Sequence, residues 1–189
     1  MTDQVKEFSL ETGKLTSEIV PALYQSISAS VPQETVFDFL EVANMAAVGG
    51  VTELETAVDG ITSVMNAYGQ ENLSAAQASD QMFTAVKLGK TTFGELASSL
   101  FNVVPTAVSA GVAFGDVTAA IATMTASGTP TSVATTQMRQ ALVELSDGGS
   151  QVGETFQKLA GTSFRDFIAS GGNVGEALNL LYDLSLIHI

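Results

Sequence analysis

The sequence contains no cysteine and no tryptophan, and its one histidine is His188, next to the C-terminal residue. Without cysteine there can be no disulfide, thiolate nucleophile or sulfur-ligated metal, and the redox compartment cannot be inferred. A metal or hydrolytic centre needs clustered ligands, or a nucleophile beside a base, and a single terminal histidine supplies neither. We therefore expect a non-enzymatic protein with no catalytic, cofactor-binding or metal-binding residues.

Basic residues are also scarce: seven Lys and Arg face twenty Asp and Glu, for a net charge of -13, and none lies between Lys14 and Lys87. Direct binding to nucleic acid is therefore not expected. The carboxylates in this stretch allow two interpretations, solvated surfaces that keep an apolar-rich chain soluble or an acidic docking face for a basic partner. They are Glu34, Asp38, Glu41, Glu53, Glu55, Asp59, Glu71 and Asp80.

Apolar residues recur at helical spacing along most of the chain, and no run of alternating strand pattern is found. The clearest helix covers residues 51–68, where Thr52 and Glu55 predict a capping box and Gly69 predicts the stop. We expect an all-α fold, either an array or a compact bundle of about 8 to 10 short antiparallel helices joined by Gly, Pro, Ser and Thr loops.

Similar start and stop signals repeat along the chain. Ser74 with Gln77, Thr92 with Glu95, and Asn173 with Glu176 predict helix starts. Pro105 predicts a kink or break in the helix that follows Thr92, and Thr129-Pro130 predicts an N-cap followed by a first-turn proline. The remaining helices are expected at 15–29, 33–48, 111–128, 130–145, around Phe156, and around Phe164. Residues 50–69 and 111–128 share a faint repeat of Gly-Val, polar entry, helix and closing Gly.

Several short motifs are weak candidates for sites. Gly89-Lys90-Thr91 matches the tail of a phosphate-binding loop, but Thr84 stands where its first glycine should be, so Gly89 is better interpreted as a helix C-cap. The pair Glu53/Glu55 is expected on different helix faces. Asp38 and Glu41 share a face at a spacing that is common on exposed helices. Asn72-Leu73-Ser74 matches a glycosylation acceptor that only a secreted protein could use.

The opening residues 1–7 mix acidic and basic side chains and do not resemble a secretory signal, so synthesis in a cytoplasm is expected. Between Glu95 and Arg139 the one charged residue is Asp116, and Gly111 and Gly115 have the spacing used by close-packed membrane helices. Polar residues and Pro105 interrupt this region, which favours buried helices with Gly111 and Gly115 at a loop. A membrane-perturbing segment centred on Phe101 to Thr125 remains an alternative.

A succession of strings resembles the tail tape-measure proteins of long-tailed phages and prophages, a family of phage-related minor tail proteins. It begins with Leu54-Glu55-Thr56-Ala57-Val58-Asp59-Gly60-Ile61 and Asn66-Ala67-Tyr68-Gly69. It continues with Ala78-Ser79-Asp80, Thr92-Phe93-Gly94-Glu95-Leu96-Ala97, Val103-Val104-Pro105, Ala119-Ala120-Ile121 and Met138-Arg139-Gln140-Ala141-Leu142. The order of these strings, over roughly residues 15–184, carries the resemblance. Ala113-Phe114-Gly115 departs from it, because the family usually has a Ser or Thr cap there.

The resemblance implies a structural protein of the virion that lies in the tail-tube lumen, sets tail length and is ejected with the genome, after assembly in the host cytoplasm. It implies contacts with tail-tube, tail-tip and tail-assembly chaperone proteins, self-association, and contact with a host membrane during ejection. Family members are far longer, so residues 1–184 are expected to form one helical module of a longer protein. Residues 185–189 resemble translated sequencing-adaptor read-through and are expected to be a non-native tail.

The frequent helix stops favour a folded anchoring or initiation module over a measuring shaft, since a ruler is best made from long uninterrupted helix. A stand-alone helical adaptor with an acidic docking face is the alternative from another class.

Overall fold

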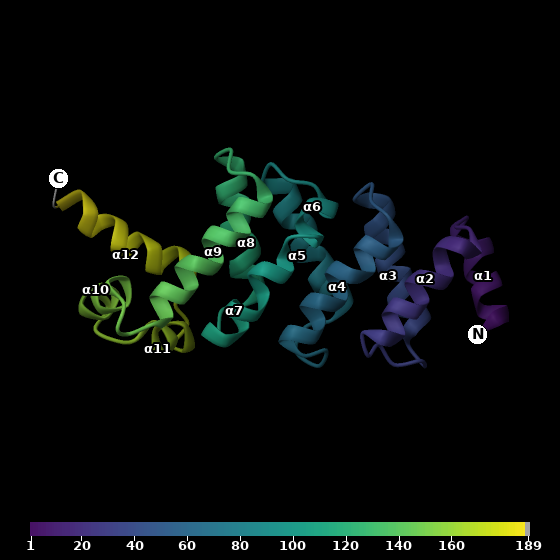
Figure 1. Ribbon diagram of the computed structural model, residues 1–189, viewed down its shortest axis with the longest axis horizontal. Helices are drawn as coiled ribbons and strands as arrows, with labels where there is room; N and C mark the ends of the chain where they lie inside the picture. The colour runs from purple at the N-terminus through teal and green to yellow at the C-terminus, as the bar shows by residue number, and fades with distance from the viewer. Residues whose placement is uncertain (188–189) are drawn as a thin grey trace.

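The computed structural model describes the backbone of residues 1–187 and the side chains of residues 1–182. Within this part the chain is all helical, as predicted, with no strand, twelve α-helices and one 3-10 helix (Figure 1). The helices are α1 Thr2–Thr12, α2 Thr16–Ser28, α3 Val36–Gly49, α4 Leu54–Tyr68, α5 Ala75–Leu88, α6 Phe93–Ala97, the 3-10 helix η1 Leu100–Asn102, α7 Val104–Ala110, α8 Phe114–Ala126, α9 Thr131–Ser146, α10 Gln151–Ala160, α11 Phe164–Ala169 and α12 Val174–Ile187.

The helices follow one another along the long axis of the molecule, from α1 at one end to α12 at the other (Figure 1). Each packs mainly on helices near it in sequence: α2 and α3 on α4, α5 and α9 on α8, and α10 on α12. The accessible surface is 9828 Å². A compact monomer of this mass would expose roughly 8,500 Å². Of the two expected arrangements, the molecule therefore forms an array.

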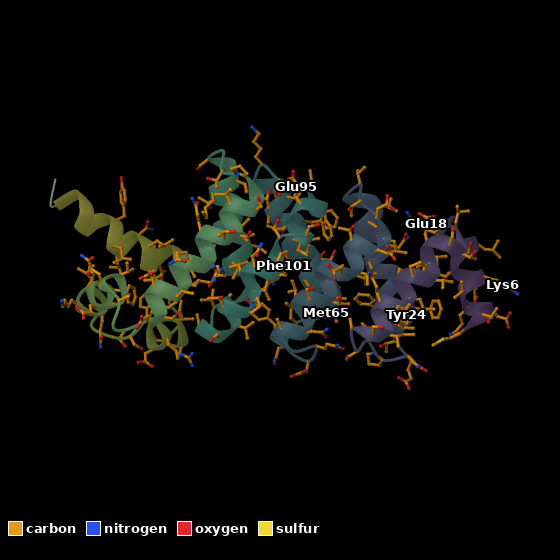
Figure 2. All side chains as sticks on the ribbon, viewed as in Figure 1. Lys6, Glu18, Tyr24, Met65, Glu95 and Phe101 are labelled. Carbon is orange, nitrogen blue, oxygen red and sulfur yellow. The ribbon has the colours of Figure 1, made fainter. Side chains whose placement is uncertain are left out.

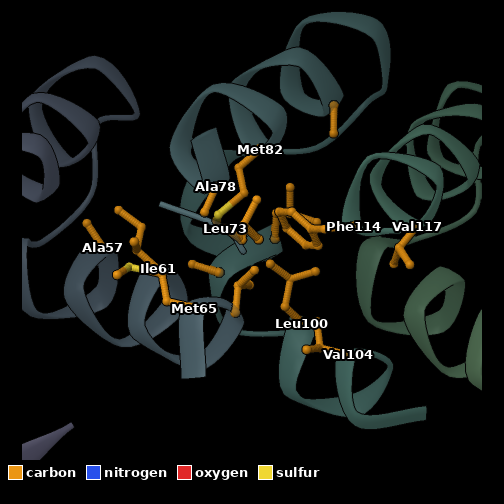
Figure 3. Packing of buried hydrophobic residues seen from close by; sticks show 14 of the residues in the cluster. Ala57, Ile61, Met65, Leu73, Ala78, Met82, Leu100, Val104, Phe114 and Val117 are labelled. Carbon is orange, nitrogen blue, oxygen red and sulfur yellow. The ribbon is translucent and has the colours of Figure 1, made fainter. Parts of the chain in front are cut away.

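The hydrophobic core runs through the array without a break, and its middle part lies between α4, α5, α7 and α8 (Figure 3). Ile61, Met82 and Leu100 are fully buried, and Phe114 is 2% exposed. Burying each such side chain contributes about 1.5–3 kcal/mol. The apolar stripe predicted for residues 51–68 supplies much of this core, because Leu54, Val58, Ile61 and Val64 of α4 all point inward.

Local capping chemistry sets several helix starts as predicted. The Ser74 hydroxyl accepts a hydrogen bond from the Gln77 N–H at 3.2 Å, and the Gln77 side chain accepts one from the Ser74 N–H at 3.0 Å. Thr92 with Glu95 and Asn173 with Glu176 make the same reciprocal pairs. These three boxes are confirmed because each one depends only on residues three apart in sequence.

Other predicted boundaries were wrong. No capping hydrogen bond from Thr52 is found. Glu53 is the N-cap, so α4 begins one residue later than a Thr52 cap predicts. Pro130 is the N-cap of α9 in place of Thr129. The helix that starts after Thr92 ends at Ala97, before Pro105, which instead lies in the first turn of α7. The first helix, α1, was not predicted at all.

The end of α3 shows why glycines alone are an incomplete guide. The helix expected at 33–48 ends at Gly49, close to the predicted place, but Gly50 has φ −87° and the left-handed residue is Val51, with φ 50°. Thr52 N–H donates to Ala47 O at 2.9 Å, which closes the helix around Val51. Gly50 is required for packing instead, since a Cβ there would lie 2.5 Å from Phe93 Cβ.

The expected non-native tail, residues 185–189, lies outside the residues whose side chains are described and stays a prediction, and His188 lies outside the described residues altogether.

Candidate functional site

The phosphate-loop candidate is a helix end whose backbone donors are already used. Gly89 N–H donates to Ala85 O at 2.8 Å, and Lys90 N–H donates to the Thr125 hydroxyl at 3.2 Å. A Cβ on Gly89 would lie 2.4 Å from Thr125 Oγ1. Glycine is therefore needed here because α5 and α8 approach closely, and its role as the C-cap of α5 is confirmed.

A polar hollow of about 570 Å³ lies beside this turn, between α6 and the start of α9. Thr91 Oγ1 and Thr131 Oγ1 are 2.7 Å apart, and Thr131 donates to Glu95 Oε2 at 3.4 Å. The same carboxylate accepts from Thr92 N–H at 3.3 Å. Glu95, labelled in Figure 2, thus caps its own helix and holds the start of α9. Sequence reasoning found the cap but missed the link between the two helices.

The one charged residue of the middle region, Asp116, lies half-buried in the first turn of α8. Burial raises the pKa of its carboxyl group above the ordinary value, and the Glu176 carboxylate raises it further. Tyr68 of α4 donates its hydroxyl to Val112 O at 2.9 Å. Burial raises the pKa of Tyr68 far above its ordinary range, and Asp116 adds to the effect. The Tyr68 hydroxyl thus links α4 to the turn before α8, and Asp116 of α8 lies close enough to Glu176 of α12 for their charges to repel.

The segment from Phe101 to Thr125 is part of the core. It is divided among η1, α7 and α8, and Val104, Ala107 and Ile121 are almost completely buried, whereas Phe101 is 64% exposed. Among the described helices, none combines the length and apolar character needed to cross a membrane. Gly111 does lie at a loop, with φ 79° as the C-cap of α7, but Gly115 was misplaced and lies in the first turn of α8.

All eight carboxylates of the base-free stretch are exposed, as both a solvated surface and an acidic docking face require. Glu53 and Glu55, expected on different helix faces, both line one hollow with Glu18 between α2 and the start of α4. Glu53 lies outside the helix, so helical spacing does not separate the two. In the part of the chain that the structure describes, no group of three or more His, Asp or Glu side chains is placed to hold a metal ion.

Asp38 and Glu41 share a face, as predicted, and line a groove of about 720 Å³ between α1 and α3. Its apolar lining includes Phe8 and Phe37, whose ring centroids are 6.1 Å apart. Glu11 of α1 adds a third carboxylate to its edge. Sequence reasoning could not find this groove, because it requires α1, whose apolar pattern is too sparse to predict a helix.

Comparison with known proteins gives these surfaces a context. The family described as "Phage-related minor tail protein" matches residues 2–185, nearly the whole chain. The chain belongs to this minor tail protein family. It is 32% identical over 191 aligned positions to a "Probable tape measure protein" of Clostridium phage phiCD119, across 96% of this chain and 20% of that relative. The chain thus spans about a fifth of the relative's length. No solved structure matches the chain.

Some of the strings that carry the resemblance in the sequence of this minor tail protein connect helices or end them. In the string Asn66-Ala67-Tyr68-Gly69, Asn66 Nδ2 donates to Ala29 O of α2's end at 2.8 Å, and Tyr68 donates to Val112 beyond α7. Gly69, with φ 89°, ends α4. At Ala113-Phe114-Gly115, where the sequence departs from the resemblance, Ala113 caps α8 without a side-chain hydrogen bond. These residues therefore have structural roles, because they connect helices or mark where helices begin and end.

Proposed function

We propose that this chain is a folded anchoring or initiation module of a phage tape-measure protein, and that it does not itself act as the measuring shaft. The observation that carries the proposal is the array of short, capped helices in a chain that belongs to the minor tail protein family. The module has a structural, non-enzymatic role. The longer protein lies in the tail-tube lumen, sets tail length and is ejected with the genome.

Length per residue separates the two roles. An uninterrupted helix rises about 1.5 Å per residue. In a stacked array, a helical pair of about 30 residues adds one interhelical spacing of about 8–10 Å, or roughly 0.3 Å per residue. The longest described helix, α9, has 16 residues. A chain folded in this way is therefore about five times shorter, per residue, than an uninterrupted helical shaft.

The exposed surface supports an assembly role. Large apolar side chains that are more than half exposed concentrate in the first 51 residues, among them Leu10, Tyr24, Met45, Val48 and Val51. Scattered exposed apolar residues are normal, but a concentration of them marks surfaces that contact partners. We propose that the partners are tail-tube, tail-tip and chaperone proteins, together with further copies of the tape-measure protein.

Deletions in the phage that encodes the chain test the proposal. An in-frame deletion in a downstream helical shaft should give tails shortened in proportion to the residues removed, as measured by electron microscopy. A deletion within Thr52 to Leu145 removes core helices, so it should block tail assembly. Tails of proportionally reduced length from the second deletion would contradict the proposal.

Ejection needs a separate measurement. Mass spectrometry of purified virions should detect peptides from this region, and the same peptides should be lost from the particles once DNA release is triggered. Peptides that stay with the emptied particles would show that the module remains in the tail.

A further inference from the structure

The groove between α1 and α3 combines an apolar surface with accessible edges. Met45 and Val48 of α3 line it and are 59% and 63% exposed. The pair Phe8 and Phe37 closes it on the side where the two helices meet. Its volume of about 720 Å³ lies within the range of about 300–1,000 Å³ that is typical of binding pockets. The groove is thus large enough to take several side chains from a partner.

The charge around the groove has one sign. Glu11, Asp38 and Glu41 line it, and no Lys or Arg does. The two bases nearest in sequence are engaged elsewhere: Lys14 Nζ lies 3.5 Å from Glu18 Oε1, and Lys6 Nζ lies 3.6 Å from Asp3 Oδ1. Lys6 lines a different hollow, with Val5 and Val20, and points outward at the end of the array (Figure 2). The carboxylates of the groove are therefore exposed, and no Lys or Arg that lines the groove neutralises them.

The groove also contains an unsatisfied acceptor. Asn44 lines it, and Asn44 Oδ1 is buried with no hydrogen-bond partner. The described part of the chain therefore supplies no donor for this atom.

We propose that this groove binds an amphipathic helical segment of another tail protein, with apolar side chains flanked by Lys or Arg. The inference rests on the proposed function, in which the chain assembles with other tail proteins. The apolar side chains would enter between Phe37, Met45 and Val48, while the bases pair with the carboxylates at the edge. A second copy of the chain fits poorly, because it carries a net charge of -13. Anionic lipid surfaces are disfavoured for the same reason.

Synthetic peptides test the groove without a phage. The probe is a labelled helical peptide of about 18 residues, five turns, with a Leu stripe flanked by Lys. A scrambled peptide of the same composition keeps the charge and loses the stripe. Fluorescence anisotropy at physiological salt should show the striped peptide binding at least about tenfold more tightly than the scrambled one, since only the stripe can bury its apolar side chains together.

Matched variants then locate the binding surface. The double variant Asp38→Asn with Glu41→Gln should weaken binding of the striped peptide about five- to tenfold, from the loss of two ion pairs. The control, Asp59→Asn with Glu71→Gln, removes the same charge from exposed positions outside the groove. It should change the affinity less than about twofold. Met45→Ser should also weaken binding, with circular dichroism showing an unchanged helix content.

Equal weakening by the two double variants would overturn the inference, because it would mean a general attraction to an acidic protein. Equal binding of striped and scrambled peptides would do the same. These results leave the deletion experiment untouched, so failure of the groove and failure of the proposed function can be told apart. In the phage, Asp38→Lys with Glu41→Lys should impair tail formation more than Asp59→Lys with Glu71→Lys.

Discussion

Replacing Gly60 by alanine should destabilise the protein, whereas helix propensity alone predicts that it stabilises. In an ordinary helix interior, Gly→Ala stabilises by about 1 kcal/mol. Gly60 lies buried in α4, and a Cβ there would lie 2.5 Å from Ala97 Cβ and 2.9 Å from Ala97 Cα. Carbon atoms normally approach to about 3.5–4.0 Å. Neither atom belongs to a flexible side-chain end, so α4 and α6 must move apart.

Overpacking of this kind costs about 1–3 kcal/mol, so Gly60→Ala should lower the free energy of unfolding by up to about 2 kcal/mol after the propensity gain. Urea unfolding followed by circular dichroism measures this as a lower midpoint with an unchanged slope. Gly115→Ala is the matched control, since it is also helical and its nearest contact would be 3.7 Å away. It should be neutral or stabilising. Adding Ala97→Gly to Gly60→Ala should restore part of the loss. A Gly60→Ala protein as stable as Gly115→Ala would refute the close contact between α4 and α6.

Three further predictions concern local features. Val51 is 93% exposed and has φ 50°. Val51→Asn should therefore stabilise by about 0.5–1 kcal/mol, because asparagine tolerates this conformation, and an unchanged midpoint would contradict the reported backbone. Burial and then the Glu176 carboxylate raise the pKa of the Asp116 carboxyl group above its ordinary value, so the folded state binds this proton more tightly than the unfolded chain does. The resulting contribution to stability is complete below the ordinary pKa and is lost as pH rises through the raised folded-state pKa. Asp116→Asn should accordingly raise the melting temperature at pH 7, by less than about 1 kcal/mol of stability, and should lose this advantage near pH 3. An equal effect at both pH values would contradict burial and Glu176 as the causes of the raised pKa. Thr92→Ala should cost about 1 kcal/mol by removing an N-cap, whereas Thr84→Ala, on an exposed helix face, should change little.

The sequence predicts what depends on neighbours three or four residues away. The boxes at Ser74, Thr92 and Asn173 and the stripe of α4 follow from local chemistry, and so the helical class could be predicted. The all-helical architecture is carried by many such local signals, each weak alone.

Tertiary contacts decided the features that the sequence did not predict. The helix α1 contains only two buried residues, Val5 and Phe8, and it depends on packing against α2 and α3. Gly50 and Gly60 look like ordinary stops or weak helix positions, yet their role is to let Phe93 and Ala97 approach. The groove could be predicted only in part. Asp38 and Glu41 could be placed on one face from their spacing, but the opposing wall from α1 could not.

We propose that this chain is a folded module whose length does not set tail length. An insertion at the exposed turn between Gly148 and Gly149 tests this, because a Cβ added to Gly148 would meet nothing within 4 Å. An added helical segment of about 60 residues would lengthen a shaft by about 90 Å. Electron microscopy of phage carrying this insertion should show tails of parental length, while the same segment inserted in a downstream shaft should lengthen them. Tails about 90 Å longer from the insertion at Gly148 would contradict the claim.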